Sequence, residues 1–442
     1  MKHFNPPLVA AFLLVAASLT ARAADEGPLP KDSTAVCPHH HRQAESRLHI
    51  GGYGEAAYTR NFFSDNVYRY KGADSEAYKN APSHGRFDIP HATIWLGYDF
   101  GKGWSFGSEI EFEHGGTGTA YETEYDEGGE LEQEAERGGE VALEQFWIQK
   151  SFSPALNLRL GHIVVPVGLL NAYHEPLNYF TVYRPEGEYN VLPSTWHQTG
   201  VSLWGRAGDW RYEAQFLAGL DAMYFNTEHW IKRGAGSAFE YDMANKYGTA
   251  LRVDNFSIPG LRLGLSGYYG HSINNTNTTA TGDKVRKLRG AVLIGSADFT
   301  YEDHGLVARG QVDYGTLSDA HRVSTLPDRG TAPYSSGDVG KAAVAVGIEA
   351  GWDLFSVLPT MRDGRQNFFL FGRYEYYNSY LPASGTENYH EYTAKHRIAV
   401  GINYRPVPQV VLKAEYSHRF LKAAYADEPS ISLGIAYEAR FL

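Results

Sequence analysis

The chain of 442 residues contains a single cysteine and no long apolar run beyond its start. Cys37 alone cannot form an internal disulfide, so the fold must be stabilised in another way. After residue 23 no segment offers the roughly 20 apolar residues of a transmembrane helix, which excludes a helical membrane protein. An excess of basic charge is also missing, because 40 Lys and Arg residues stand against 51 Asp and Glu residues. This balance argues against nucleic acid as a partner.

The first 23 residues have the pattern of a secretory signal peptide. Lys2 gives a positive start, residues 8–20 form a short apolar core, and residues 21–23 read Ala-Arg-Ala. A small-x-small sequence after such a core is typical of a cleavage site. We therefore expect an exported protein that consists of a cleaved signal (1–23), an unstructured leader (24–46) and one folded unit (47–442).

Alternation of apolar and polar residues is the dominant pattern of the remaining chain. At the C-terminus Ile431, Leu433 and Ile435 alternate with Ser432 and Gly434. A period of two with one apolar face indicates a β-strand that has one face toward hydrocarbon and one toward water. About sixteen such segments can be counted, near 47–60, 84–99, 103–114, 141–152, 155–165, 197–207, 209–219, 247–256, 260–271, 288–301, 305–316, 342–355, 366–377, 394–405, 409–419 and 430–442.

The connections between these segments alternate between short and long. Short ones include 101–102, 153–154 and 207–208, whereas long ones lie near 61–83 and 115–140. Tight turns on one rim and long loops on the other are typical of outer-membrane barrels, and an even number of strands allows the first and last to pair. Aromatic residues at the predicted strand ends suit the two membrane interfaces. The sequence therefore predicts an all-β, 16-stranded antiparallel transmembrane β-barrel, with its leader in the periplasm.

Three short motifs resemble the phosphate-selective porin O and P family. They are the opening strand at residues 49–55 (HIGGYGE), the segment 159–168 with RLGH and PVG, and the segment 199–205 (TGVSLWG). The resemblance implies a trimeric outer-membrane channel in which the third long loop folds inward and narrows the pore. In this chain that constriction loop would span about 166–196.

If the apolar face of each strand meets lipid, the other face lines the lumen. Charged side chains there would create a transverse field that orders water and favours one sign of ion, although many could instead pair with cross-strand neighbours. The predicted pore-lining residues are Arg159, Arg206, Arg211, Arg252, Arg262, Arg309, Arg373, Arg397, Lys413, Glu213, Glu349 and Glu375. Glu55 and Glu144 fall on the same face.

Polar and aromatic residues of the predicted constriction loop are its candidate site. They are His174, Glu175, Tyr179, Tyr183, Arg184, Glu186 and Glu188. Arg184 is the one basic residue between positions 169 and 195, so these residues do not predict a phosphate-specific site. Four prolines would stiffen the loop, which could alternatively pack over the mouth of the barrel.

Two further segments could hold cations. The predicted outer loop at 121–140 carries nine acidic residues, which could share divalent cations with lipopolysaccharide, although such a run is more often a solvated loop. In the leader, Cys37, His39, His40 and His41 have the composition of a transition-metal site, but without fixed geometry or further spaced ligands an unstructured tract is the favoured interpretation. We expect no other cofactor.

These patterns together predict a porin for passive diffusion of small hydrophilic solutes or ions with modest selectivity. Its partners would be outer-membrane lipid, lipopolysaccharide and two further copies of the chain. A channel specialised for an anion such as phosphate, or for a transition-metal ion, is the main alternative. No nucleophile–base signature or nucleotide-binding loop occurs in the sequence, so an enzyme is not expected, and a barrel enzyme or adhesin is the third possibility.

Overall fold

The computed structural model describes most of the chain after the predicted signal and leader. The described residues are 47–64, 67–70, 83, 85–114, 119–125, 131–137, 140–236, 242–273, 275, 288–326, 337–358, 366–385, 387–422 and 424–442. The predicted signal peptide, the leader and its Cys37, His39, His40 and His41 lie outside them.

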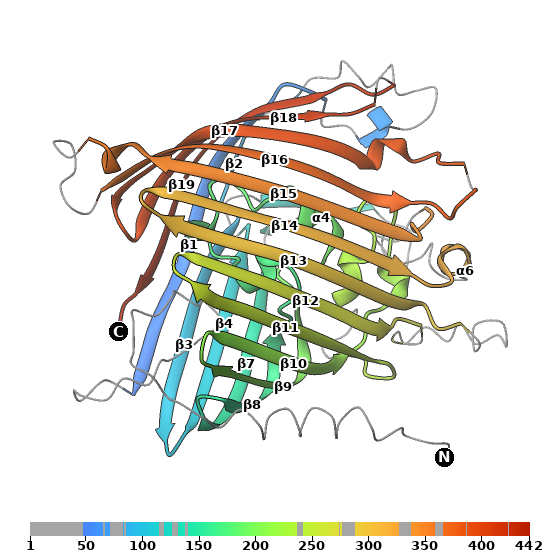
Figure 1. Ribbon diagram of the computed structural model, residues 1–442. Helices are drawn as coiled ribbons and strands as arrows, with labels where there is room; N and C mark the ends of the chain where they lie inside the picture. Colours follow the sequence, from blue (N-terminus) through green and yellow to red (C-terminus); the bar gives the residue numbers. More distant parts are fainter. Residues whose placement is uncertain are drawn as a thin grey trace, which may run out of the picture.

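Sixteen strand positions form one closed antiparallel sheet (Figure 1). The prediction of a 16-stranded barrel is confirmed. The strands are β1 (Leu48–Asn61), β2 (Gly85–Asp88) with β3 (His91–Gly101), β4 (Trp104–Glu113), β7 (Glu140–Ser153), β8 (Leu156–Val164), β9 (His197–Ala207), β10 (Trp210–Ala218), β11 (Tyr247–Ile258), β12 (Leu261–His271), β13 (Ala291–Asp303), β14 (Leu306–Leu317), β15 (Ala342–Asp353), β16 (Asn367–Leu381), β17 (Ala394–Val407), β18 (Val410–Phe420) and β19 (Glu428–Arg440).

The two end strands close the barrel. β1 pairs with β19 in a continuous antiparallel register from Gly51↔Arg440 to Asn61↔Ser430. On its other edge β1 pairs with both β2 and β3. Closure leaves neither end strand with an unpaired edge, which is the condition for a sheet to stand in hydrocarbon.

The second predicted strand, 84–99, is divided in the structure. β2 ends at Asp88 and β3 begins at His91, with Ile89 and Pro90 between them. Proline has no backbone N–H to give to a sheet ladder, so pairing is interrupted there. Both pieces pair with β1 and together occupy one strand position in the barrel. Seventeen strand segments therefore fill sixteen strand positions.

Large apolar side chains cover the outer face of the barrel. Leu265, Leu293 and Ile348 are about half exposed, as expected for side chains that face lipid rather than a protein core. Exposed aromatic residues gather at the two ends of the strands. They include Phe100, Trp104, Phe152, Trp210 and Trp352 near the short turns, and Phe216, Tyr247, Tyr269, Tyr314 and Tyr416 near the long loops. These bands suit the two membrane interfaces.

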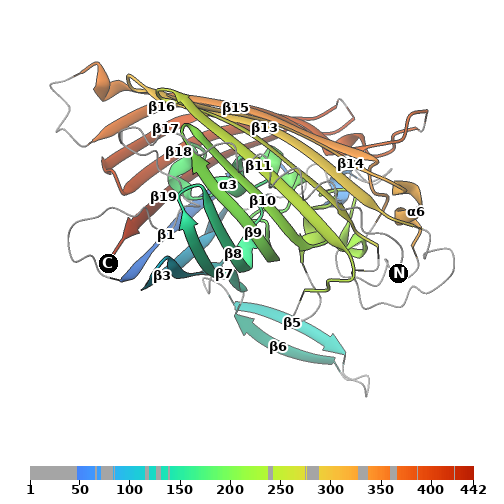
Figure 2. The same cartoon turned by 60° about the horizontal axis from the view of Figure 1, so that its bottom comes forward.

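The long loops contain further structure. The acidic segment, predicted as a simple outer loop, forms a hairpin of β5 (Thr119–Tyr125) and β6 (Leu131–Arg137) that projects from the barrel (Figure 2). The helical turns are η1 (Val67–Tyr70), α3 (Leu169–Ala172), η3 (Pro176–Asn178), α4 (Glu186–Val191), η4 (Ala222–Tyr224), η5 (Lys232–Ala235), α6 (Ala320–Ser324), η7 (Leu354–Ser356) and η8 (Glu391–Thr393).

Within the described ranges, every helix is too short or too polar to span a lipid bilayer.

Candidate functional site: the barrel lumen

The segment 165–196, which we call the inner loop, lies inside the barrel (Figures 1 and 2). It leaves the end of β8 and returns to the start of β9. Its two ends are joined where Val165 N–H donates to the Trp196 carbonyl (2.7 Å) and Trp196 N–H donates to the Asn171 side chain (2.8 Å). Most of its side chains are buried. The position expected for the constriction loop is therefore occupied by this segment.

Glu188 organises the first half of the inner loop. Its carboxylate accepts hydrogen bonds from the backbone N–H groups of Leu169 (3.0 Å) and Leu170 (2.8 Å), at the start of α3. A side chain at the preceding Gly168, where φ is +91°, would come within 2.1 Å of that carboxylate. Glycine is required there, because it allows both this backbone angle and the close approach.

Lys413 on β18 fastens the middle of the inner loop to the wall. Its buried ammonium group donates to three loop carbonyls, those of Pro176 (2.7 Å), Tyr179 (3.0 Å) and Thr181 (2.9 Å). An ammonium group has three donors, so all of them are used. Next to it, Glu415 of the same strand accepts from Val182 N–H (2.7 Å).

Glu186 fastens the last third of the inner loop to the same wall. Its carboxylate accepts from Arg419 Nε (2.6 Å) and from the Tyr377 hydroxyl (2.9 Å), and it lies 3.4 Å from Arg397 Nε. Burial alone would raise the pKa of Glu186, but the charges of Arg397 and Arg419 outweigh burial and hold the pKa well below its usual value. The neighbouring Gly187 N–H donates to Glu375 (3.0 Å).

Aromatic contacts complete the docking of the inner loop. Phe180 stacks on Phe371 with ring centroids 5.5 Å apart and lies against Phe369. The ring of Tyr173 lies 4.5 Å from the Arg262 guanidinium. Such contacts, typically worth about 0.5–1.5 kcal/mol each beyond their buried area, attach the loop to β12 and β16.

The predicted pore-lining residues face the interior, and most of them form ion pairs with one another. On β11–β13, Arg252 and Arg262 share Asp254 and Asp298 at 2.5–3.0 Å. On β14–β18 a second ladder runs through Arg309, Glu349, Arg373, Glu375, Arg397 and Glu415, at 2.7–3.1 Å. Arg211 forms an ion pair with Glu213 at 2.8 Å, and Arg159 donates a hydrogen bond to Gln149. The side chains of Arg206 and Arg309 are half-buried. These walls carry balanced charge.

The wall formed by β1, β4 and β7 is different, because carboxylates dominate it. We call this surface the acidic wall: Glu55, Glu109, Glu111, Glu113 and Glu144. Four of the five are buried, and Glu113 has about one third of its side chain exposed. Arg184 of the inner loop faces Glu111 at 3.6 Å. Among the described residues it is the one guanidinium paired with this wall.

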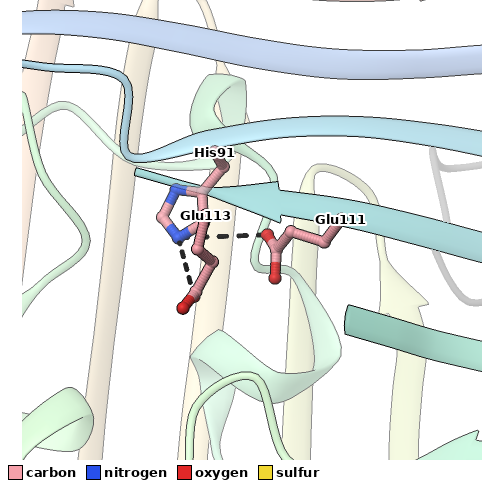
Figure 3. Close-up of side chains that lie close together, drawn as sticks. All are labelled: His91, Glu111 and Glu113. Carbon is pink, nitrogen blue, oxygen red and sulfur yellow. Dashed lines mark ion pairs between the residues drawn. The ribbon is translucent and has the colours of Figure 1, made fainter. Parts of the chain in front are cut away.

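The outer part of the acidic wall surrounds His91 at the start of β3. His91 Nδ1 contacts Glu55 at 2.5 Å, whereas Nε2 lies 3.9 Å from Glu111 and 3.7 Å from Glu113 (Figure 3). The nearest oxygens of these two carboxylates and the ring nitrogen lie within 4.8 Å of one another. One imidazole and two carboxylates in this arrangement could hold a metal ion.

A second group of the same composition lies two residues further along β4. His174 of the inner loop has Nε2 3.8 Å from Glu109, and Glu144 of β7 completes a set within 4.8 Å. Burial alone would lower the pKa of His174, but the charge of Glu175 and the carboxylate of Glu109 raise it to about 9. Glu175 of the inner loop and Glu109 of the acidic wall thus both favour the charged imidazole.

A β-bulge places Glu144 on the acidic wall. In the β4–β7 ladder Glu109 pairs with Gln145 and Ile110 pairs with Leu143, so Glu144 is an extra residue without a partner. Strand residues normally alternate between the two faces, but here Glu144 is buried and Gln145 is half-buried while Leu143 and Phe146 are exposed. Bulges commonly redirect a side chain in this way.

Of the residues predicted for the constriction, the structure places His174, Glu175, Tyr179, Arg184 and Glu188 in buried positions of the inner loop, with Tyr183 and Glu186 half-buried. Sequence reasoning did not single out His91, Glu109, Glu111, Glu113 or Arg419. The alternation Glu109-x-Glu111-x-Glu113 on one strand face was a signal that could have found the acidic wall. His91 and Arg419 carry no comparable local signal.

Comparisons with known proteins identify similar proteins but no matching family. No protein-family profile matches the chain. An uncharacterized protein of Aquifex aeolicus (strain VF5) is 27% identical over 381 residues, which cover 85% of this chain and 76% of that protein. The membership expected from the three short motifs therefore stays a prediction.

Several solved structures are similar at low identity. The outer membrane channel DcaP of Acinetobacter baumannii is 10% identical over 89% of this chain and 97% of its own, with a TM-score of 0.49. An anion-selective porin from Comamonas acidovorans is 11% identical over 89% and 98%, with a TM-score of 0.47. OmpF of Salmonella typhi is 10% identical over 88% and 97%, with a TM-score of 0.49.

The strand pairing, the apolar outer face and the charged interior establish the architecture without these neighbours. The chain is a porin-like 16-stranded barrel with an inner loop fastened to its lumenal wall.

Proposed function

We propose that the protein is an outer-membrane porin through which small hydrophilic solutes and ions diffuse passively. The observation that carries this proposal is the contrast between an apolar outer face and an interior lined by ionised side chains. Charges of this kind would be a large cost in a lipid-facing or dry position, but they are useful beside water and permeating ions. Signal cleavage, export and the outer-membrane location belong to this proposal.

The inner loop would set the narrowest part of the path. It contacts Glu415 and Lys413 on β18, Glu375 on β16 and Ser266 on β12, so it is held at several points around the lumen. A loop fixed in this way can divide the lumen without sealing the barrel. The inner loop also touches the acidic wall, through Arg184 and His174, so the path would pass beside these contacts and past the partly exposed Glu113.

A weak preference for cations follows from this position. The acidic wall carries five carboxylates, of which Glu113 is the most exposed, and one guanidinium, Arg184, is paired with them among the described residues. Carboxylate rings and ladders attract cations and repel anions. A phosphate-specific channel is disfavoured for the same reason, because Arg184 already faces Glu111.

Planar-bilayer recording of the full-length protein tests the proposal. We expect ohmic single-channel steps in KCl and a reversal potential of cation-selective sign under a salt gradient. A purified barrel that folds, shown by a heat-dependent shift on gels, but gives no steps would overturn the channel function. Swelling of liposomes in small sugars would extend the test to uncharged solutes.

The homotrimer suggested by the resemblance is a further part of the proposal. An outer-membrane protein of Vibrio cholerae that has a similar chain path is described in a trimer form, with 10% identity and a TM-score of 0.47. That statement concerns the other protein. Gel mobility before and after heating, together with the mass of the detergent complex, would decide the state of this chain.

A further inference from the structure

We propose that the acidic wall binds divalent transition-metal ions at two adjoining sites. The outer site consists of His91, Glu111 and Glu113, and the inner site of Glu109, Glu144 and His174. Passage of the ion through these sites rests on the proposed channel function, whereas binding itself does not.

The inner site has ligands that the surrounding protein leaves unused. Glu144 is 1% exposed, and no N–H donor among the described residues reaches its carboxylate, which instead faces the carboxylates of Glu109 and Glu111. His174 is 5% exposed, and its ring nitrogens make no close hydrogen bond among the described residues, with Nε2 lying 3.8 Å from Glu109. Buried polar atoms are nearly always partnered, and an unpartnered buried carboxylate is especially costly. A bound cation would satisfy both groups at once.

The third ligand of the inner site is oriented by its neighbours. Gln145 donates a hydrogen bond to Glu109, and Trp147 donates to the Gln145 side-chain carbonyl (3.2 Å). Metal-ligating groups are commonly held by such outer contacts, which fix their direction before the ion arrives. The bulge turns Glu144 toward the inner site. The hydrogen bonds from Trp147 to Gln145 and from Gln145 to Glu109 orient another ligand of the same site.

The outer site shows a related arrangement around His91. Glu55 contacts Nδ1 of His91 at 2.5 Å, which leaves Nε2 directed at Glu111 and Glu113 (Figure 3). A carboxylate on one ring nitrogen with a metal on the other is a recurrent pattern, because the carboxylate fixes the tautomer and makes the imidazole more basic. Glu113, with 32% of its side chain exposed, is the ligand most open to solvent.

The donor set selects the class of ion. Each site offers one imidazole nitrogen and carboxylate oxygens, and neither contains sulfur. Imidazole suits zinc and other first-row transition metals, whereas Mg²⁺ and Ca²⁺ prefer oxygen ligands alone.

The two sites follow one another along β4. Glu109, Glu111 and Glu113 lie on one face of β4 at two-residue intervals, about 7 Å apart. Ions move through channels when several moderate sites succeed one another, because each ion can leave toward the next. His174 belongs to the inner loop, so an ion at the inner site would also join the loop to the acidic wall.

Equilibrium dialysis and bilayer recording with zinc test the proposal on full-length protein. Cys37, His39, His40 and His41 are first replaced by alanine in every sample, so that zinc on the leader cannot contribute. We expect about two zinc ions per chain and reversible block of the K⁺ current by zinc, with magnesium much weaker. Glu144→Gln and His174→Gln should each abolish one ion and raise the half-blocking zinc concentration at least about tenfold.

Glu391→Gln is the matched control. Glu391 is an exposed carboxylate on η8 that pairs with Lys422, so its loss should change neither zinc binding nor block. Absence of zinc binding to the folded background protein, or equal binding by the Glu144 and His174 variants, would overturn the proposal. If the protein with the replaced leader residues conducts no K⁺ current, the proposed channel function is wrong. Equilibrium dialysis would still show whether zinc binds at the two sites.

Discussion

Replacing Lys413 with methionine should loosen the inner loop while leaving the barrel closed. Methionine keeps a similar length and volume but removes the ammonium group. The carbonyls of Pro176, Tyr179 and Thr181 would then lose the donor that they share. No backbone hydrogen bond of the β17–β18 or β18–β19 ladder depends on this side chain.

The expected magnitude follows from these three contacts. Hydrogen bonds to a charged group contribute about 1.5–3 kcal/mol each, and part of this is offset because the buried ammonium is no longer desolvated. Removing one charged partner from a buried arrangement costs about 3–5 kcal/mol in other proteins. On that scale the ratio of docked to undocked loop would fall by about 100-fold or more.

Limited proteolysis and single-channel noise measure this loss of docking. Lys413→Met should be cut within the inner loop, around 176–181, much faster than the unmodified protein, and its open-channel current should fluctuate more. Lys422→Met is the control, because Lys422 is half exposed and its pair with Glu391 is worth at most about 1 kcal/mol. Identical cleavage rates and noise in Lys413→Met and the unmodified protein would refute the role of Lys413.

Three further predictions concern the same lumen. Glu186→Gln should also weaken docking at neutral pH. Because the pKa of docked Glu186 is lowered, its contribution to loop docking is fully present above the ordinary pKa near 4.3 and is lost as the pH falls through the docked value. The proteolysis rates of Glu186→Gln and of the unmodified protein should therefore converge only in strong acid. Gly351→Ala should displace Phe180, whose ring lies 2.3 Å from the added Cβ, and lower the free energy of unfolding by about 1–3 kcal/mol. Gly372→Ala is the control, because its added Cβ meets nothing within 4 Å. Thermal unfolding compares the two variants, and equal midpoints would contradict this prediction. Glu113→Gln should shift the KCl reversal potential toward zero, and an unchanged potential would show that the path avoids the acidic wall.

The barrel was predictable because its signal is local. The alternation at 431–435, for example, lies within a few residues and corresponds directly to β19, with Leu433 outward and Ser432 inward. The break at Pro90 and the hairpin β5–β6 were missed, because a strand count based on alternation does not register a single missing N–H or a polar hairpin outside the membrane.

The docking of the inner loop could not be predicted in the same way. Lys413 meets Thr181 across 232 residues of chain, and Glu186 meets Arg419 across 233. Nothing in the local pattern of either segment specifies the other. The sequence did place Lys413 on the lumenal face of its strand, because the direction of a strand side chain depends only on alternation.

Gln145 shows why part of the lumen escapes such reasoning, since alternation predicts Glu144 on the lumenal face but not the residue beside it. Regular alternation cannot turn both Glu144 and Gln145 toward the interior, and it is the bulge that permits this. With that one extra residue, β7 supplies both a carboxylate that no N–H donor reaches among the described residues and the amide that holds Glu109. Without it, one of the two side chains would face lipid and the inner site would lose a ligand or its support. Deleting Leu143 or Val141 to remove the bulge should therefore leave a pairable strand but weaken zinc binding, and retained binding would show that the bulge is incidental.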